Sequence, residues 1–503
     1  MFSKILIANR GEIAVRIIRA CKEMGISTVA VYSEADREAL HVSLADESIC
    51  IGGPQTKDSY LNMTSVLSAA IVTGAEAIHP GYGLLSENPK FAALCQECNI
   101  VFIGPDAATI SLMGDKDQAR KTMRDAGVPV IPGGDVMETL EEAEAAADEI
   151  GYPLLIKARS GGGGRGIRKV DSHNEFAAAY KTASAEAESA FGDGAVYLEK
   201  YLYPAKHIEV QILADKNGDV ISLGERNCSI QRKNQKLIEE SPSPALPEET
   251  RQRMLETAVK AAKAVKYENA GTLEFLVTEQ GDFYFMEMNT RLQVEHPITE
   301  EVIGVDLVKE QIKVADGQVL QLKQENIQQR GHAIECRICA EDTEMNFMPS
   351  PGIIKQITEP NSIGVRIDSY VYEGYEIPIY YDPMIGKLIV WATNREYAIE
   401  RMRRVLHEYK LTGVKNNISY LRAIMDTPDF VEGHYDTGFI TKNGEYLQQR
   451  IMRTSEHSEN IALIAAYMDY LMNLEENNSG MATDNRPISK WKEFGLHKGV
   501  LRI

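Results

Sequence analysis

The sequence predicts an α/β protein that begins with a doubly wound parallel sheet, continues into a smaller αβ unit with a glycine-rich loop, and ends in a mixed α and β region. Short apolar segments alternate with helical patterns over residues 1 to about 113. A run of four glycines, 161–164, lies between two strand-like segments. A hairpin pattern at 272–288 leads into an unusually polar run. At 503 residues the chain can hold more than one domain with a well-buried core.

The first region predicts parallel strands joined by helices. The strand-like segments are residues 5–8, 28–32, 48–52, 77–79 and 101–104. The first helix shows one apolar face, formed by Ile13, Ile17, Ala20, Cys21 and Met24. This alternation is typical of a Rossmann-like sheet. The first turn, Asn9-Arg10-Gly11-Glu12, does not match GxGxxG, so we do not expect a bound NAD.

The middle of the chain predicts a helical linker, a small αβ unit and then longer strands. The linker helix covers about 116–127 and is stopped by Pro129 and Pro132. Residues 152–199 follow the order strand, glycine loop, strand, helix, strand. Further elements are strands at 207–215 and 220–226, a helix at 248–266, and a hairpin that joins 272–277 to 283–288.

The residue pattern changes twice in the C-terminal part of the chain. Residues 331–445 predict a mixed β and α cap on the same body. Beyond Asn443, residues 458–474 form an apolar-rich helical pattern, and 477–480 have the composition of a flexible linker. Two alternatives remain for this helix: it packs on the body, or it docks a partner protein.

Composition and charge exclude several classes of protein. The chain has 54 Lys and Arg against 73 Asp and Glu, and its net charge of −19 disfavours nonspecific binding to nucleic acid or anionic membranes. The apolar run 5–8 is too short for a signal peptide, and no run has the length of a transmembrane helix, so we expect a cytoplasmic protein. The CxxC pairs Cys95/Cys98 and Cys336/Cys339 lie too far apart for a zinc ribbon, and we expect these residues to be buried.

The glycine run predicts a flap that closes over phosphates. Consecutive glycines let the backbone approach a ligand and point several amide N–H groups at it. A strand at 154–156 places Lys157 just before the run, and Arg165, Arg168 and Lys169 are close by in the sequence. The loop is not a Walker A motif. The alternative is an ordinary flexible loop.

The run from Glu287 to Glu295 predicts a ligand-binding strand. If it is extended, one face carries Glu287, Asn289, Arg291, Gln293 and Glu295, and the other carries Met288, Leu292 and Val294 into the core. Glu274, on the paired strand, could bring its carboxylate towards Glu287. Glu274, Glu287 and Asn289 supply the oxygen ligands that Mg²⁺ prefers. The alternative is an exposed polar strand face.

Two further segments carry polar residues of note. His207, Glu209 and Gln211 share one strand face, but no second histidine has a spacing that suits zinc. Residues 226–236 are basic and rich in amides. Such a run is either solvated surface or, beside an acidic ladder, an anion clamp.

Taken together, these motifs resemble those of biotin carboxylase, the ATP-grasp component of biotin-dependent carboxylases. The resemblance covers about residues 1–445. The matching motifs are 7–14, 79–83 with 85–88, 113–116, 161–166, 228–236, 287–297, 335–337 and 349–352. It implies a Rossmann-like N-terminal domain at 1–114, an ATP-grasp domain at 115–330 with a glycine-rich lid at about 131–203, an α+β C-terminal domain at 331–445, and a helical tail and linker at 446–503.

The resemblance also implies the roles of individual residues. The ATP-contacting positions are Lys116, Lys157, Gly161, Gly162, Gly163, Gly164, Gly166, Glu199, Lys200, Leu202, His207, Gln231 and Asn234. The metal positions, for Mg²⁺ or Mn²⁺, are Glu274, Glu287 and Asn289. The bicarbonate positions are Lys236, Arg291, Gln293, Val294 and Glu295, with Lys236, Arg291, Glu295 and Arg337 catalytic. Glu295 matches the proposed base, and Tyr82 and Arg337 match biotin contacts.

The implied reaction is the ATP-dependent carboxylation of biotin with bicarbonate, through carboxyphosphate. Because the sequence lacks Met-Lys-Met, the biotin carboxyl carrier protein and the carboxyltransferase are expected on separate chains. Arg19, Glu23 and Arg366 match dimer contacts, and Ile363 replaces an aromatic residue there, so we expect a homodimer. The alternative for Arg19 and Glu23 is a plain i,i+4 surface pair.

One position departs from the family pattern, and two rival functions remain. Asn234 stands where many members have histidine, which puts that ATP contact in doubt and, with the long tail, leans towards an acyl-CoA system. The final acceptor, which could be acetyl-CoA, propionyl-CoA or pyruvate, stays open. The rivals are another ATP-grasp ligase with a different acid and acceptor, and a catalytically silent assembly protein.

Overall fold

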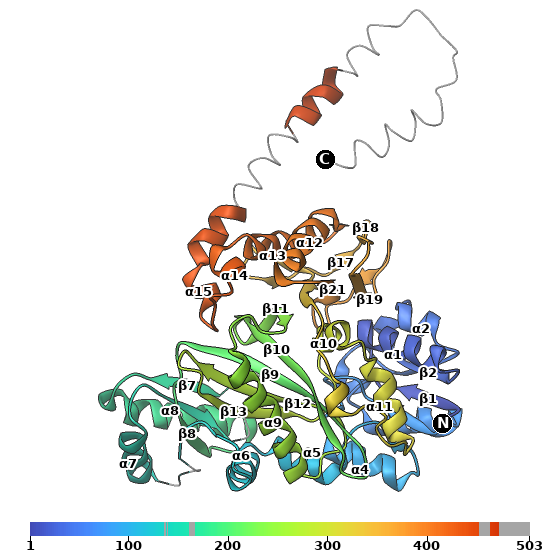
Figure 1. Cartoon of the computed structure of the whole chain (residues 1–503). Coiled ribbons are helices and arrows are strands. Elements are labelled where there is room, and N and C mark those ends of the chain that lie inside the picture. Colours follow the sequence, from blue (N-terminus) through green and yellow to red (C-terminus); the bar gives the residue numbers. More distant parts are fainter. Residues whose placement is uncertain (135–136, 138, 160–165, 452–462, 472–503) are drawn as a thin grey trace, which may run out of the picture. The chain divides into compact units, whose positions relative to one another are not determined.

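The computed structural model describes residues 1–503 except 135–136, 138, 160–165, 452–462 and 472–503 (Figure 1). The chain forms two compact units, Met1–Lys442 and Asn443–Ile503, which are described separately. Among the described residues, none of the helices combines the length and apolar character needed to cross a membrane.

A parallel five-stranded sheet forms the start of the first unit. Its strand order is β3-β2-β1-β4-β5, with every neighbouring pair parallel, as the βα alternation predicted. The strands are β1 (Lys4–Ile7), β2 (Ser27–Ser33), β3 (Glu47–Gly52), β4 (Ala77–His79) and β5 (Val101–Phe102). The helices and 3-10 turns are α1 (Gly11–Glu23), η1 (Glu34–Asp36), α2 (Leu40–Leu44), η2 (Thr56–Asp58), α3 (Met63–Thr73), α4 (Pro89–Glu97) and α5 (Ala107–Gly114).

A small antiparallel sheet follows in the order predicted from the sequence. It has strand order β7-β6-β8 and comprises β6 (Leu154–Ala158), β7 (Ile167–Val170) and β8 (Val196–Lys200). The helices of this region are α6 (Lys116–Asp125), α7 (Leu140–Ile150) and α8 (His173–Phe191). The predicted loop glycines 161–164 lie outside the described residues, whereas Gly166 has a φ of 73° just before β7.

An antiparallel eight-stranded sheet forms the centre of the first unit. Its order is β13-β12-β9-β10-β11-β14-β21-β19. The strands are β9 (Ala205–Ala214), β10 (Val220–Arg232), β11 (Gln235–Ser241), β12 (Asn269–Thr278), β13 (Phe283–Asn289), β14 (His332–Cys339), β19 (Val365–Ser369) and β21 (Met384–Ala392). Strands from the predicted middle and C-terminal regions therefore share one sheet, which places their side chains on common faces.

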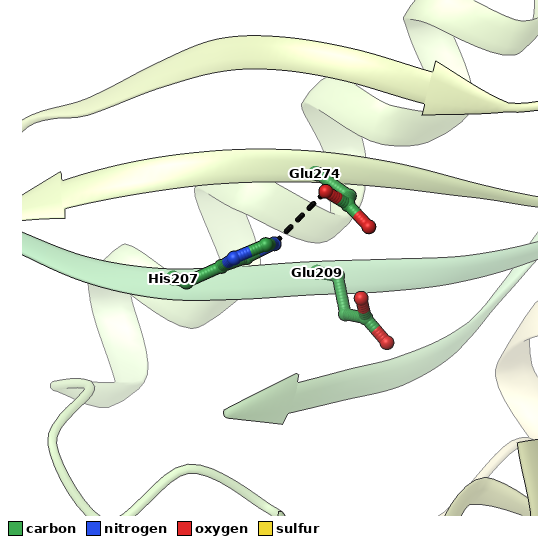
Figure 2. Close-up of side chains that lie close together, drawn as sticks. All are labelled: His207, Glu209 and Glu274. Carbon is green, nitrogen blue, oxygen red and sulfur yellow. Dashed lines mark ion pairs between the residues drawn. The ribbon is translucent and has the colours of Figure 1, made fainter. Parts of the chain in front are cut away.

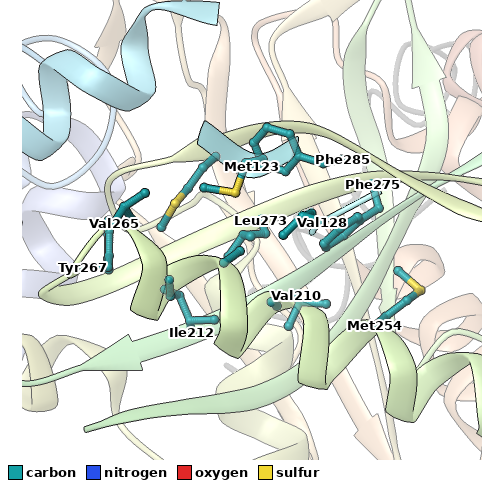
Figure 3. Packing of buried hydrophobic residues seen from close by; sticks show 14 of the residues in the cluster. Met123, Val128, Val210, Ile212, Met254, Val265, Tyr267, Leu273, Phe275 and Phe285 are labelled. Atoms are coloured by element: carbon teal, nitrogen blue, oxygen red, sulfur yellow. The ribbon is translucent and has the colours of Figure 1, made fainter. Parts of the chain in front are cut away.

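The helix α9 (Glu248–Ala264) covers one face of this sheet and closes a hydrophobic core (Figure 3). Met254 from α9 packs with Val210, Phe275 and Phe285 from the strands, and all four are fully or almost fully buried. Burial of such side chains contributes roughly 1.5–3 kcal/mol each. The opposite face of the same strands is therefore free to carry polar groups.

The remaining elements complete the first unit. They are α10 (His296–Ile303), α11 (Leu307–Ala315), η3 (Gln324–Asn326), β15 (Glu341–Asp342), β16 (Met348–Pro349), β17 (Gly352–Ile353), β18 (Gln356–Thr358), β20 (Glu376–Ile377), α12 (Arg395–Glu408), β22 (Lys410–Thr412), α13 (Ile418–Met425), α14 (Pro428–Glu432) and α15 (Phe439–Lys442). The pairs β15–β16, β17–β20 and β18–β22 each form a two-stranded ribbon.

In the second unit, residues 463–471 are helical, within the predicted helix 458–474, whose other residues lie outside the described part. Its apolar side chains are exposed, with Leu463 at 69% and Tyr467 at 62%. The predicted linker 477–480 also lies outside the described residues.

The expectation for the cysteines is confirmed for three of the four. Cys95, Cys336 and Cys339 are buried, and burial raises the pKa of the Cys95 thiol to about 12. The prediction was wrong for Cys98, which is exposed because it caps the C-terminus of α4.

Candidate active site

The polar run after Glu287 is a strand only at its beginning, so the prediction of one extended ladder was wrong. The strand β13 ends at Asn289, and residues 290–295 form a loop that leads into α10. The backbone N–H of Thr290 donates to Glu87 Oε1 at 3.1 Å instead of continuing the ladder. Leu292 is buried as expected, but Val294 is only partly buried.

The ammonium group of Lys236, on β11, is the centre of a carboxylate cluster. Its Nζ lies 2.6 Å from Glu209, 3.0 Å from Glu274 and 2.5 Å from Glu295. Glu209 and Glu274 are opposite each other on β9 and β12. Burial disfavours the charge of Lys236, but the three carboxylates outweigh that effect and raise its pKa well above the usual value.

A fully buried guanidinium holds this cluster in place. Arg226, on β10, lies 2.5 Å from Glu209 and donates to Gln211 and to Gln293, at 2.8 Å in each case. Of the basic run 226–236, Arg226 and Lys236 therefore reach the carboxylates. In contrast, Lys233 is exposed, which corresponds to the solvated alternative.

Glu295 lies between two cations. Its carboxylate contacts Lys236 on one side and Arg337 Nη2, at 3.0 Å, on the other. Burial by itself would raise the pKa of Glu295, but the charges of Lys236, Arg337 and Arg226 hold it well below the usual value. The group is thus an ionised carboxylate at neutral pH, in a place closed to water.

The guanidinium of Arg337, on β14, has a second acidic partner. Its Nε donates to Glu239 Oε1 at 2.7 Å. Burial raises the pKa of Glu239 to about 7, although the charge of Arg337 acts in the opposite direction. Arg337 therefore links two acids of very different proton affinity.

One histidine and two glutamates on β9 and β12 lie close together (Figure 2). His207, Glu209 and Glu274 offer ligand atoms that all lie within 4.8 Å of one another. His207 Nε2 is 3.0 Å from Glu274, and its Nδ1 is 2.7 Å from the amide of Gln231. Glu209 is already paired with both Arg226 and Lys236, so a metal ion in this group would be a third cation beside the same carboxylate.

The pair Glu274 and Glu287 fits a metal ion better. The two residues are opposite each other across β12 and β13, as expected from the hairpin. Burial, and next the charge of Glu274, raise the pKa of Glu287, so a cation here would relieve the repulsion between two carboxylates. Asn289, whose amide donates to Glu274 at 2.9 Å, adds an oxygen donor. This oxygen-only set suits Mg²⁺ or Mn²⁺.

A second set of predicted residues lies on the small sheet and on α6. Lys157, on β6, forms an ion pair with the buried Glu199 of β8. The ammonium of Lys200 donates to the carbonyls of Gly151 and Tyr152, at 3.1 Å each, and Leu202 is partly buried. Lys116, at the start of α6, is 3.9 Å from Glu287 and so joins this set to the metal pair.

Asn234 lies at the exposed tip of the hairpin between β10 and β11. Lys233 and Asn234 have φ values of 48° and 63°, the geometry of a two-residue turn. Asparagine tolerates this left-handed conformation better than most residues, which gives a structural reason for its presence at this position.

Family models match almost the whole first unit. "Biotin carboxylase, N-terminal domain" matches residues 1–110, and "Biotin carboxylase C-terminal domain" matches 335–442. Between them, "Carbamoyl-phosphate synthase L chain, ATP binding domain" matches 115–323. The chain belongs to the biotin carboxylase family. This assignment confirms the α/β class with an ATP-grasp core.

Relatives of this biotin carboxylase extend the match. The biotin carboxylase of Nostoc sp. is 56% identical over 440 residues, which are 87% of this chain and 98% of the relative. A pyruvate carboxylase chain of Methanothermobacter thermautotrophicus is 52% identical over 481 residues, 93% of this chain and 98% of the relative. Since 7% of 503 residues is about 35, this second match includes part of 443–503.

A solved structure shows the same fold with ligands. The biotin carboxylase domain dimer of the 2-oxoglutarate carboxylase from Hydrogenobacter thermophilus was determined in complex with MgADP, ADP and bicarbonate. It is 51% identical, has a TM-score of 0.86, and covers 89% of this chain and 99% of its own.

Several charged residues of the site were not identified from the sequence. Glu87 accepts from Arg291 Nε at 2.9 Å, and Arg120 lies 3.7 Å from Glu199. Glu239 and the fully buried Lys387 also belong to this group. The consecutive acids at 239–240, directly after Leu237 and Ile238, were a usable signal, and Glu87 lies in the matching motif 85–88, whereas Arg120 and Lys387 gave none.

Proposed function

We propose that this biotin carboxylase uses ATP and bicarbonate to carboxylate biotin on a carrier protein, as the first half-reaction of a biotin-dependent carboxylase. The observation that carries this proposal is the position of Glu295, an ionised buried carboxylate held between Lys236 and Arg337. That arrangement combines a proton acceptor with two oxyanion-binding cations.

The ATP-binding role belongs to residues of α6, of the small sheet and of the segment 199–202 at the end of β8. Lys116 and Lys157 would supply positive charge for the phosphates, and the segment 199–202 would contact the adenine base. Lys157 is paired with Glu199, so ATP would exchange a carboxylate partner for a phosphate. Glu274, Glu287 and Asn289 would hold Mg²⁺ or Mn²⁺, which supplies charge neutralisation for the transferring phosphoryl group.

Bicarbonate would bind beside Glu295 and Lys236, with Arg291, Gln293 and Val294 as the other positions that the family resemblance implies. Glu295 takes the bicarbonate proton as the oxygen attacks the γ-phosphorus of ATP, which gives carboxyphosphate and ADP. The bound anion also shares the charge of Lys236, and this raises the proton affinity of Glu295 at the moment it is needed.

Biotin would be carboxylated at the Arg337 side of the site. Carboxyphosphate breaks down to CO₂ and phosphate, the phosphate takes the N1′ proton of biotin, and the resulting enolate attacks CO₂. The negative charge then lies on the ureido oxygen, where a guanidinium stabilises it best. Tyr82, whose hydroxyl donates to Glu12, would border this end of the site.

The direct test of the function is ADP release by the purified protein. With Mg-ATP present, bicarbonate and free biotin are added separately and together, and the release is repeated without divalent metal. We expect fast release only when both substrates and the metal are present. Release with bicarbonate but no response to biotin would instead indicate an ATP-grasp ligase with another acceptor.

The partner chains of this enzyme are the carrier protein and the carboxyltransferase, and the chain itself pairs as a homodimer. Ile363, on the proposed dimer face, is 88% exposed. Of the other expected dimer contacts, Glu23 lies 2.6 Å from Lys309, and Arg366 lies 2.7 Å from Glu300.

The tail is expected to matter for assembly rather than for catalysis. The described helix 463–471 exposes Leu463, Tyr467 and Leu471 along one side. A chain that lacks residues 446–503 should keep its ADP release but lose co-purification with the carboxyltransferase chain, measured by size-exclusion chromatography of the co-expressed proteins. Unchanged assembly would rule out this docking role. A Tyr467→Phe chain serves as the conservative control.

A further inference from the structure

A lysine outside the predicted site lies at the meeting point of three regions. Lys387, on β21, is fully buried. Its Nζ donates to the backbone carbonyl of Val294 at 2.9 Å and lies 3.1 Å from Glu12 Oε1. Glu12 belongs to the first turn of α1, Val294 to the loop before α10, and Lys387 to the sheet strand next to β14. One ammonium group thus connects segments that lie 93 residues or more apart in the sequence.

Each of these contacts leads to a residue of the proposed site. Val294 directly precedes Glu295, so a hydrogen bond to its carbonyl fixes the peptide unit that carries the proposed base. Glu12 uses the same Oε1 to accept the hydroxyl of Tyr82. Lys387 is also opposite Arg337 across β14 and β21. The bicarbonate end and the biotin end of the site therefore share one anchor.

The need for a lysine at position 387 is not explained by a contribution to folding stability alone. A buried lysine is costly unless it is paired, and apolar residues of similar volume can often replace a buried ion pair without loss of stability. Asp368, 3.8 Å from Lys387, is already neutralised by Arg366 at 2.8 Å. What a methionine could not supply at position 387 is the directed hydrogen bond to Val294 and the charge that orders Glu12.

We propose that Lys387 is a positioning residue that sets the Val294–Glu295 peptide and the Tyr82 hydroxyl relative to each other. The proposal rests on the proposed function. It assigns to Lys387 no contact with substrate: its effect passes through Val294 on one side and through Glu12 and Tyr82 on the other.

The test begins with Lys387→Met, which keeps the length of the side chain and removes its charge and donors. We expect the biotin-dependent kcat for ADP release to fall by about 10- to 100-fold, the loss typical of a small misplacement of catalytic groups. The KM for ATP should stay unchanged, because Lys116 and Lys157 lie on other elements. Adding Tyr82→Phe to Lys387→Met should lower the biotin-dependent kcat little further than Lys387→Met does by itself. Both changes disturb the same contacts, which run from Lys387 through Glu12 to Tyr82.

A double variant separates positioning from folding. Lys387→Met leaves the Glu12 charge buried, so the double variant Lys387→Met/Glu12→Gln should recover the melting temperature. If the double variant also recovers the biotin response, the ion pair is only structural and the proposal is wrong. A folded Lys387→Met enzyme with a wild-type biotin response overturns it equally.

The control for loss of a positive charge is Lys216→Met. Lys216 is 53% exposed and lies 3.8 Å from Glu268, so its loss should leave all rates unchanged. The wild-type enzyme, assayed in parallel, separates a failure of the proposed function from a failure of the positioning role of Lys387. If it gives no biotin response, the proposed function fails, and the role of Lys387 fails with it. A normal wild-type response with an unaffected Lys387→Met enzyme rejects the positioning role alone.

Discussion

Replacing Glu295 by glutamine is expected to remove most of the bicarbonate-dependent ADP release and to leave the fold intact. Glutamine keeps the shape of the side chain and can accept a hydrogen bond from Lys236 or Arg337, but it cannot take a proton. General-base catalysis contributes about 10²- to 10⁴-fold, and we expect a loss in that range.

The variant should stay folded because both cations keep other acidic partners. Lys236 still has Glu209 and Glu274, at 2.6 and 3.0 Å, and Arg337 still has Glu239 at 2.6 Å. Loss of the third carboxylate therefore leaves neither charge buried alone, which is the situation that destabilises most.

The measurement is the initial rate of ADP release at saturating Mg-ATP over a range of bicarbonate concentrations. Glu248→Gln is the matched control, since Glu248 is 68% exposed and pairs with Arg251 at the surface. If Glu295→Gln retained a rate within about tenfold of wild type, the loss would be too small for a general base and the role of Glu295 would have to be reassigned.

The sequence predicted the parts of the site that depend on one strand or one hairpin. The pairing of Glu274 with Glu287 follows from a short connection and a period of two, and both are local properties. The parallel order of the first sheet follows from βα alternation in the same way. The roles that the family resemblance gives to individual residues remain predictions.

Contacts between segments that lie far apart in the sequence could not be predicted from local residue patterns. Alternation could not show that the strand stops at Asn289, because the N–H of Thr290 is taken by Glu87, more than 200 residues earlier in the chain. The same limit applies to Lys387, which in the sequence is one lysine in an apolar strand. Its partners Glu12 and Val294 are brought to it only by the packing of three regions.

Replacing Arg337 by alanine is expected to impair the biotin half of the reaction much more than ATP binding. Arg337 contacts Glu295 and Glu239, whereas Lys116, Lys157 and Glu199 lie on the small sheet and α6. Loss of a single group that stabilises a developing oxyanion costs about 10²- to 10³-fold in kcat, and we expect that loss with biotin as the variable substrate. The KM for ATP should change by less than about threefold.

The acid left behind explains why this variant should fold. Arg337 opposes the rise in the pKa of Glu239, which is nonetheless about 7 in the native protein. Without the guanidinium that pKa rises further, so Glu239 becomes a neutral acid at the assay pH and avoids a buried unpaired charge. Relative to wild type, Arg337→Ala should therefore lose less stability at about pH 6 than at about pH 8.5, because Glu239 is harder to protonate at the higher pH.

Two further variants define what the site needs from Arg337. Arg337→Lys keeps the charge but loses the planar fork, and it should recover only part of the biotin-dependent rate. Arg404→Ala removes an exposed guanidinium that pairs with Glu408 at 2.7 Å, and it should behave as wild type. An Arg337→Ala enzyme that loses ATP affinity and biotin response to the same degree would place Arg337 in nucleotide binding. Full recovery by Arg337→Lys would mean that the site requires a positive charge and not the two-pronged contact that joins Glu239 to Glu295.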